Sequence, residues 1–300
     1  MSPTVRAKRA TFKALHLEGC FFLPNPWDVG SAVMLQGLGF KALATTSSGH
    51  AWSLGRPDGT TPRAILLEHL RAVVAATDLP VNADFESGFG DSPAGVAESV
   101  RMAIDTGVAG LSIEDSTGTP EQPIRSLDDA VARLRAARAA IDDAGADTLL
   151  VGRAENFFAD RPDLEDTIAR LEAYSDAGVD CLYAPGLKKR DHIEAVVRAV
   201  APKPVNLLVG SASEFTLADI AAMGVRRVSV GGALARAAWG AFLRAARGLA
   251  QDGRFDGFRG AASGDELNAF FADAAAPSDP PTTSTPGATA SSPARGNTAQ

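Results

Sequence analysis

Cysteine is nearly absent from this chain. Only Cys20 and Cys181 occur among 300 residues, and each lies beside apolar residues in an expected strand. Two separated thiols cannot build a disulfide framework or a zinc cluster. We therefore expect two buried free thiols and a fold stabilised by its hydrophobic core.

Long hydrophobic runs and clusters of basic residues are missing as well. The apolar runs are short and interrupted by Asp, Arg or Gly, and the N-terminal segment MSPTVRAKRATFKAL lacks the apolar stretch of a signal peptide. We therefore expect no membrane span and a cytoplasmic location. The net charge is −7 and the Lys and Arg residues are dispersed, which excludes a nucleic-acid footprint and favours a small-molecule partner.

What the chain does contain is a regular alternation of short apolar runs and amphipathic segments. With 45% hydrophobic residues, 300 residues suit two ordinary domains or one large α/β barrel. The expected strands are residues 20–23, 41–46, 80–84, 109–114, 148–154, 180–184, 204–208 and 226–230. Helical segments between them include residues 61–76, 92–106, 126–144, 163–177 and 190–200.

Eight such β/α units predict a single (β/α)₈ barrel of the TIM type, spanning residues 1–262. Ser92 and Pro93 mark a helix start, and Gly107, Gly178 and Gly224 have the position of a glycine that ends a helix before a strand. The alternative is an open Rossmann-like sheet, which is weakened because no G-x-G-x-x-G follows the first strand.

The C-terminal part differs in composition from the expected barrel. Residues 263–275 predict an extra helix with Leu267, Phe270 and Phe271 on one face, and such a face needs a partner surface. Residues 276–300 are rich in Pro, Ser and Thr and lack apolar periodicity, so we expect a disordered tail.

Acidic residues gather where the expected strands end, which is the active face of such barrels. Asp84 and Glu86 follow the third strand, and Glu114 ends the fourth. Three carboxylates at one rim repel one another unless a cation lies among them, and Mg²⁺ with its waters suits such ligands. The fifth strand ends in Arg153, which could face a substrate carboxylate or could itself be that cation.

Other polar residues at this rim are weaker candidates. Residues 45–49, TTSSG, offer hydroxyls and backbone N–H groups to an oxyanion, and Asn206 lies near the end of the seventh strand. His50 is a candidate acid or base, or simply an exposed loop residue. Taken singly, Asp28 and Asp115 are expected to be helix caps or solvated. The three histidines on expected helices should lie at the surface: His16, His69 and His192.

The motifs NPWDVGSA, TTSSG with LGRPDG, NADFESGFGD, GLSIEDS, VGRAENF and PVNLL resemble, in order and spacing, the isocitrate lyase and phosphoenolpyruvate mutase superfamily. The resemblance covers about residues 12–275. It implies a barrel that uses Mg²⁺ or Mn²⁺, binds a 2-oxo acid and stabilises its enolate while a C–C or P–C bond is made or broken. It also implies a homotetramer whose subunits exchange the C-terminal helix.

Residue by residue, the resemblance implies a metal site and a substrate site. Asp84 resembles the principal metal ligand, with Glu86 and Glu114 as water-mediated partners, and Asp58 is similar to the acid near the metal waters. The residues similar to the family's substrate-binding and catalytic groups, together with their neighbours, are Thr46, Ser47, Ser48, Gly49, Arg153 and Asn206.

The sequence departs from the family in the loop after the fourth strand. Residues 116–123, STGTPEQP, contain neither the acid/base cysteine of the lyases nor the Lys and Asn of the mutases and phosphonopyruvate hydrolases, and Gly186 replaces a lyase glutamate. We expect a Mg²⁺-dependent carbon–carbon lyase, for oxaloacetate-like decarboxylation or isocitrate- or methylisocitrate-type cleavage. A phosphoenolpyruvate or carboxyphosphonoenolpyruvate mutase, a phosphonopyruvate hydrolase and a catalytically silent oxo-acid-binding protein remain as alternatives.

Overall fold

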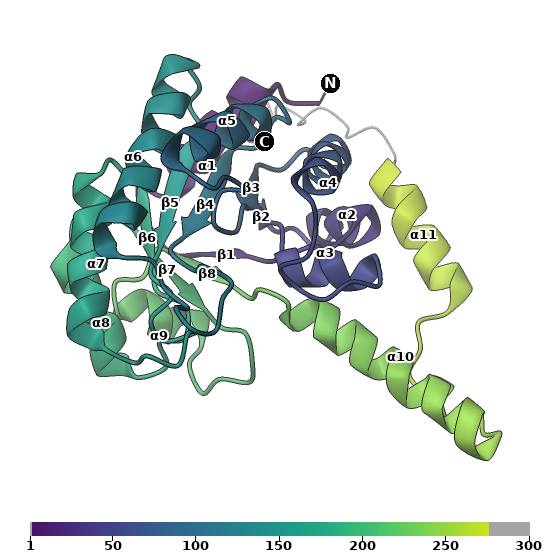
Figure 1. The fold of residues 1–300 in the computed structure, drawn as a ribbon. Coiled ribbons are helices and arrows are strands. Elements are labelled where there is room, and N and C mark those ends of the chain that lie inside the picture. The colour runs from purple at the N-terminus through teal and green to yellow at the C-terminus, as the bar shows by residue number, and fades with distance from the viewer. Residues whose placement is uncertain (1, 276–300) are drawn as a thin grey trace, which may run out of the picture.

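The computed structural model describes residues 2–275, which form a parallel barrel with helices outside it (Figure 1). The tail expected at residues 276–300 lies outside the described residues. The strands of the described chain are β1 (Phe21–Leu23), β2 (Leu43–Ala44), β3 (Val81–Asp84), β4 (Gly110–Glu114), β5 (Leu149–Arg153), β6 (Cys181–Tyr183), β7 (Val205–Leu208) and β8 (Arg227–Ser229).

The helices follow the strands in the order that the sequence predicts. They are α1 (Val5–Leu15), α2 (Val29–Gly37), α3 (Ser47–Ser53), α4 (Arg63–Ala75), α5 (Pro93–Ile104), α6 (Leu127–Asp143), α7 (Leu164–Asp176), α8 (Arg190–Val200), α9 (Leu217–Ala222), α10 (Ala233–Asp252) and α11 (Gly264–Ala275), with a short 3₁₀ turn, η1 (Asp256–Phe258). No helix of the described residues is long and apolar enough to cross a membrane.

The strands are parallel and hydrogen-bonded in the order β1-β8-β7-β6-β5-β4-β3-β2. The remaining seam between β1 and β2 is bridged at its upper end, where the Ala44 N–H donates to the Pro24 carbonyl over 3.0 Å. The Asn25 side-chain amide adds a bond of 2.9 Å to the Thr45 carbonyl. The (β/α)₈ prediction is thus confirmed and the open Rossmann-like sheet is excluded.

Local signals explain why the helices begin and end where they do. The Ser92 hydroxyl accepts from the Gly95 N–H, and Pro93 occupies the first helical position of α5. Gly107, Gly178 and Gly224 have φ of 87°, 91° and 86°, the left-handed conformation that ends a helix before the next strand.

Side chains inside the barrel form an apolar base and a polar top. At the base, Phe12 of α1 is fully buried against Phe21, Leu149 and Cys181, so α1 closes the N-terminal end of the barrel. Cys20 is half-buried, and both cysteines are free as expected. The larger apolar cluster lies between the strands and the surrounding helices. With the base filled, the cavity lies above it and opens at the end where the strands stop.

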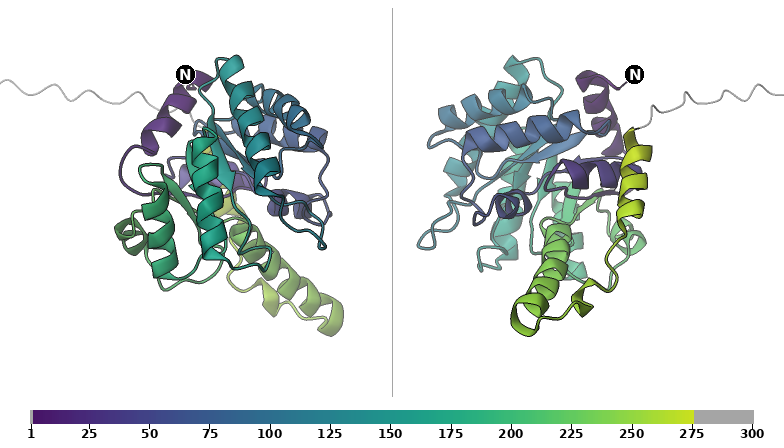
Figure 2. Two further views of the ribbon diagram at one scale, coloured as in Figure 1. Left: turned by 60° about the vertical axis from the view of Figure 1, so that its left-hand side comes forward. Right: turned by 90° about the vertical axis from the view of Figure 1, so that its right-hand side faces the viewer.

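The last helices leave the barrel as an arm. α10 projects away from the strands and α11 returns along the barrel's side, as Figure 1 and the right-hand view of Figure 2 show. α11 packs on α2, where a Cβ on Gly37 would lie 2.6 Å from the Phe270 ring. A helix forms where the sequence predicts one, and Phe270 packs on α2, while Leu267 and Phe271 remain 37% and 38% exposed. The need of this face for a further partner surface stays a prediction. Exchange of α11 between subunits stays a prediction.

Replacement of Phe12 by alanine tests the role of α1 as the closure of the barrel. Because the ring is fully buried, Phe12→Ala should lower the free energy of unfolding by about 3–5 kcal/mol. Urea unfolding followed by circular dichroism measures this. Leu17→Ala, at a side chain 78% exposed, is the control and should change stability by less than about 0.5 kcal/mol. Equal stability of the two variants would contradict this role.

Candidate active site

A cavity of about 630 Å³ opens at the C-terminal ends of the strands. Its wall contains many of the polar residues expected from the sequence: Thr46, Ser47, Ser48, Asp58, Asp84 and Arg153. Five other candidates do not line it: Gly49, His50, Glu86, Glu114 and Asn206. The lining that the sequence analysis did not anticipate includes Lys188 after β6, residues 209–215 after β7 and Arg236 of α10. Inside the barrel it includes Asn82, Ser112, Arg227 and Ser229.

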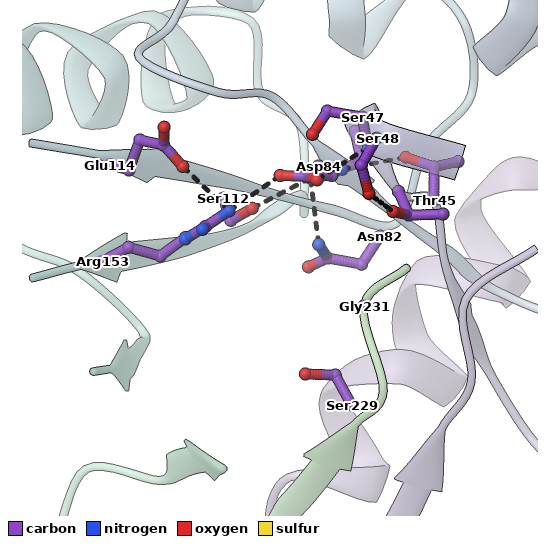
Figure 3. Close-up of polar contacts among 12 residues, drawn as sticks. Thr45, Ser47, Ser48, Asn82, Asp84, Ser112, Glu114, Arg153, Ser229 and Gly231 are labelled. Atoms are coloured by element: carbon purple, nitrogen blue, oxygen red, sulfur yellow. Dashed lines mark hydrogen bonds and ion pairs between the residues drawn. The ribbon is translucent and has the colours of Figure 1, made fainter. Parts of the chain in front are cut away.

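Arg153 lies at the centre of a group of carboxylates (Figure 3). Its Nη1 contacts Asp84 Oδ1 at 2.8 Å and Glu114 Oε2 at 3.0 Å, and its Nε donates to Glu155 Oε1 at 2.9 Å. Burial opposes its charge, but Glu114, Glu155 and Asp84 together raise the pKa of Arg153 well above its ordinary value. The rim therefore carries a permanent cation, as one of the two sequence-based interpretations of Arg153 expected.

Asp84 connects this cation to the hydroxyl-bearing turn. Its Oδ2 accepts from the Ser47 N–H over 2.9 Å, while its own N–H donates to the Thr45 hydroxyl. The Thr46 and Ser48 hydroxyls lie 3.1 Å apart at the start of α3. Strand β3 and the β2–α3 turn thus place one carboxylate and several hydroxyls at the same wall of the cavity.

Glu86 combines an unusual backbone conformation with an unpartnered carboxylate oxygen. It adopts a left-handed backbone conformation with φ of 44°, and its Oε1 is buried without a hydrogen-bond partner. Burial, with the charges of Asp84 and Asp58, raises its pKa to about 7. An unpaired carboxylate oxygen in this position fits a hard divalent cation or its waters.

Among the described residues, no three His, Cys, Asp or Glu side chains are grouped so that they could hold a metal ion. Arg153 Nη1 lies between Asp84 and Glu114 and forms an ion pair with each. Asp84 is the one of the three predicted ligands that reaches the cavity. A cation held mainly by Asp84, with waters to the other two carboxylates, is compatible with this arrangement. Asp58 stands at the cavity wall, where burial raises its pKa, the Ser47 hydroxyl opposes that shift and Asp84 adds to it.

The expectation that Asp115 is solvated or a helix cap is wrong. It is buried, and its carboxylate accepts from Tyr174 Oη at 2.7 Å, Arg170 Nη1 at 3.1 Å and the Glu155 N–H at 2.8 Å. It thereby fixes the backbone of Glu155, which in turn holds Arg153. Glu114 ends β4 and Asp115 follows it. Because neighbouring residues of an extended chain face opposite sides, the sequence indicates that these two acids point apart, but not that Asp115 is buried. Asp28, by contrast, caps α2 as expected.

The histidines also depart from expectation. His16 and His69 are buried rather than exposed, and His192 is half-buried. His50 stacks on His69 with ring centroids 3.7 Å apart, and Nε2 of each ring is buried without a hydrogen-bond partner. Burial lowers the pKa of both rings, that of His69 to about 3. A role for His50 as a proton donor stays a prediction, and its packing between α3 and α4 does not favour it.

The loop after β4 is short and closed on itself. A bridge between Ser116 and Ile124 joins its ends, and the Thr117 N–H donates to the Pro123 carbonyl over 3.0 Å. Apart from Glu121, its residues 116–123 carry no titratable side chain. The loop therefore brings no thiol or amine to the cavity.

The chain is similar in sequence and fold to known enzymes. A family model described as phosphoenolpyruvate phosphomutase matches residues 12–250. A crystal structure from Burkholderia cenocepacia J2315, described no more finely than as a lyase/mutase, is 49% identical and covers 89% of this chain and 97% of its own, with a TM-score of 0.86. The oxaloacetate decarboxylase of Paraburkholderia xenovorans is 32% identical over 238 residues, which is 76% of each protein. A structure of oxaloacetate acetylhydrolase with its product oxalate is 26% identical, covers 89% of this chain and 94% of its own, and has a TM-score of 0.79.

The stacked histidines predict a pH dependence of stability. The folded-state pKa of His69 is about 3, below the ordinary value of 6.5, so the unfolded chain binds more protons between these values. Its contribution to the free energy of unfolding is therefore lost as the pH falls from 6.5 towards 3. His69→Phe should make urea-unfolding stability less sensitive to pH over this range.

His192→Phe, at a half-buried histidine on α8, is the matched control and should retain the wild-type dependence. The same pH dependence in His69→Phe and the wild-type protein would show that His69 is not the group responsible.

Proposed function

The chain belongs to the phosphoenolpyruvate phosphomutase family, within a superfamily of lyases and mutases that act on oxo acids, and from this we propose that it is a Mg²⁺-dependent carbon–carbon lyase. Its substrate is a small 2-oxo carboxylic acid that reacts through an enolate, and its reaction is an oxaloacetate-like decarboxylation. The 32% identity to an oxaloacetate decarboxylase over three quarters of the chain supports this choice.

The observation that carries the proposal is the juxtaposition of Asp84, Arg153 and the hydroxyl-bearing turn in one cavity. In the proposed reaction, Thr46, Ser47 and Ser48 bind the carboxylate and the oxo oxygen of the substrate. Arg153 is already oriented by three carboxylates, so it opposes the negative charge that develops on the enolate without reorganisation.

Asp84, with Glu86 and Glu114 directly or through water, would hold Mg²⁺ or Mn²⁺. The buried unpaired Oε1 of Glu86 supports this assignment. When bound, such a cation acts as a Lewis acid towards the 2-oxo group. Asp58, at the cavity wall beside Ser47, would accept hydrogen bonds from the waters of that cation.

Decarboxylation is favoured over aldol-type cleavage because the loop after β4 has no thiol or amine for proton transfer. Loss of CO₂ needs no protein base, whereas the cleavage reactions of the lyases need an acid/base group in the loop after β4. That loop brings neither thiol nor amine here, and His50 does not line the cavity. Water then protonates the enolate.

We also propose that the protein is a homotetramer in the cytoplasm. The arm formed by α10, η1 and α11 supports assembly, because it exposes Phe242, Leu243, Phe255 and Phe258 beyond the barrel. Exposed aromatic clusters of this kind are typical of subunit contacts.

Light scattering coupled to gel filtration should give about four times the chain mass of 31.0 kDa. Phe255→Asp and Phe258→Asp together should reduce that mass, because they place charge in the contact. Leu17→Asp, at an exposed leucine far from the arm in sequence, is the control. A wild-type mass equal to one chain would contradict the tetramer.

A turnover screen tests the reaction. With Mg²⁺, the purified protein should convert oxaloacetate to pyruvate above the metal-catalysed background, and EDTA should abolish the excess. Asp84→Ala should lower kcat/KM by roughly a thousandfold, because it removes several kcal/mol of charge stabilisation. Asp91→Ala, at an exposed acid of the same segment, is the control and should retain activity.

The same screen includes methylisocitrate, isocitrate and phosphonopyruvate. Glyoxylate or pyruvate from the first two, or phosphate from the third, would replace the proposed reaction with cleavage or P–C chemistry. Full activity in Asp84→Ala, or turnover that EDTA leaves unchanged, would overturn the proposed metal site.

A further inference from the structure

A second buried arginine lies deeper in the barrel, below the site already described. Arg227 is the first residue of β8, its side chain is directed into the barrel, and it is 2% exposed. The preceding residue, Arg226, is on the opposite side of the chain and is half-buried. Arg227 forms part of the cavity wall together with Asn82, Ser112 and Ser229, which come from β3, β4 and β8.

The partners of Arg227 are uncharged. Its Nε donates to Asn206 Oδ1 over 2.8 Å, and its Nη1 lies 3.4 Å from both Asn82 Oδ1 and His16 Nε2. Within residues 2–275, no carboxylate forms an ion pair with Arg227, and Nη2 has no recorded hydrogen bond. Asn206 orients this guanidinium and donates to the Ser229 hydroxyl, and its role in substrate binding stays a prediction.

His16 does not compensate the positive charge of Arg227, because its ring is neutral. Its Nδ1 lies 2.7 Å from the Phe12 carbonyl and must donate to it, so Nε2 carries the lone pair that faces Arg227. Burial, then the charge of Arg227, lowers the pKa of His16 to about 3, and the ring is neutral.

The two other titratable neighbours are neutral as well. Burial raises the pKa of the Cys181 thiol, and it raises that of Tyr183 to about 12. Burial also lowers the pKa of Arg227, but arginine remains protonated at any pH at which the protein is folded. Arg227 is therefore a buried cation without a counter-ion among the described residues, in contrast to Arg153 with its three carboxylates.

A buried, uncompensated charge costs several kcal/mol of stability unless an anion accompanies it. The cavity gives an anion access to Arg227. The Ser229 hydroxyl, which accepts from Asn206, also lines it and keeps its own proton to donate. Arg227 lies beside Asn82, and Asp84 at the rim is two residues further along β3. At the usual rise per strand residue, these two levels of the barrel are roughly 6–7 Å apart. A short dicarboxylate can span that distance.

We propose that Arg227 is an anion subsite that binds a distal carboxylate of the substrate, while the 2-oxo acid end lies at Asp84 and the hydroxyl-bearing turn. This inference rests on the proposed function. The distal carboxylate is not the one lost as CO₂, because an ion pair to the departing group would stabilise the ground state and slow its loss. The substrate therefore carries a third carboxylate in addition to the one beside the oxo group and the one lost as CO₂. Oxaloacetate is the simplest analogue that undergoes the same reaction but lacks this acidic arm.

Two matched probes test the subsite by binding rather than by turnover. 2-Oxoglutarate and 2-oxopentanoate have the same chain length and the same 2-oxo acid end, but only the first has a distal carboxylate. Neither carries a carboxylate that a β-decarboxylase would remove. Isothermal titration calorimetry, with Mg²⁺ and again with EDTA, should show that the wild-type protein binds 2-oxoglutarate about 10- to 100-fold more tightly.

Arg227→Gln keeps amide N–H donors for Asn206 while removing the charge, and it should abolish the preference without weakening 2-oxopentanoate binding. Arg226→Gln, on the outer side of the same strand, is the control and should keep the preference. Arg227→Met is a second variant, whose apolar side chain avoids the cost of a buried charge.

Equal binding of the two probes by the wild-type protein, including failure to bind either, would overturn the subsite. So would a preference that survives in both Arg227 variants. Because these titrations need no turnover, they are decided independently of the oxaloacetate screen: a protein without decarboxylase activity could still show the preference, and an active decarboxylase could lack it.

Discussion

The ion-pair cluster around Arg153 is the interaction on which the organisation of this site depends. Three carboxylates from different strand ends converge on one guanidinium, which would otherwise be an isolated charge in a buried position. Asp115, Arg170 and Tyr174 extend the cluster outward between the sheet and α7. The ends of β3, β4 and β5 are thereby held in register at the point where the chemistry is proposed to occur.

The interior of the barrel carries charge unevenly along its axis. Apolar side chains and Phe12 fill the base, neutral amides and Arg227 occupy the middle, and the acids with Arg153 form the rim. A ligand entering the cavity first meets Asp58 and Asp84, where the proposed divalent cation would change the sign of the local field. It then meets a cation that the protein leaves unpaired. This gradient suits an elongated anion with one chelating end.

Much of this architecture is predictable from the sequence because the signals are local. Apolar runs predict all eight strands, and helix caps and helix-ending glycines mark the segments between them. The acids of the rim are predictable because they stand where those apolar runs stop. Burial of His16, His69 and Asp115 could not be predicted, since it depends on which neighbouring element covers each side chain. The inward direction of Arg227 is a further example: two consecutive arginines give no sign of which one faces the barrel, and hydrophobicity argues against either.

The pairing of β1 with β8 has a consequence for how the chain reaches its native state. Phe21 is among the first strand residues to be synthesised, yet its ladder partner Arg227 comes from the last strand, and the seam to β2 offers only bonds beyond the end of β1. During translation, β1 therefore has no sheet neighbour until nearly the whole barrel has emerged from the ribosome. Arg227 itself lies on β8, so a nascent chain truncated before that strand lacks both the ladder partner of Phe21 and the buried guanidinium that Asn206 orients.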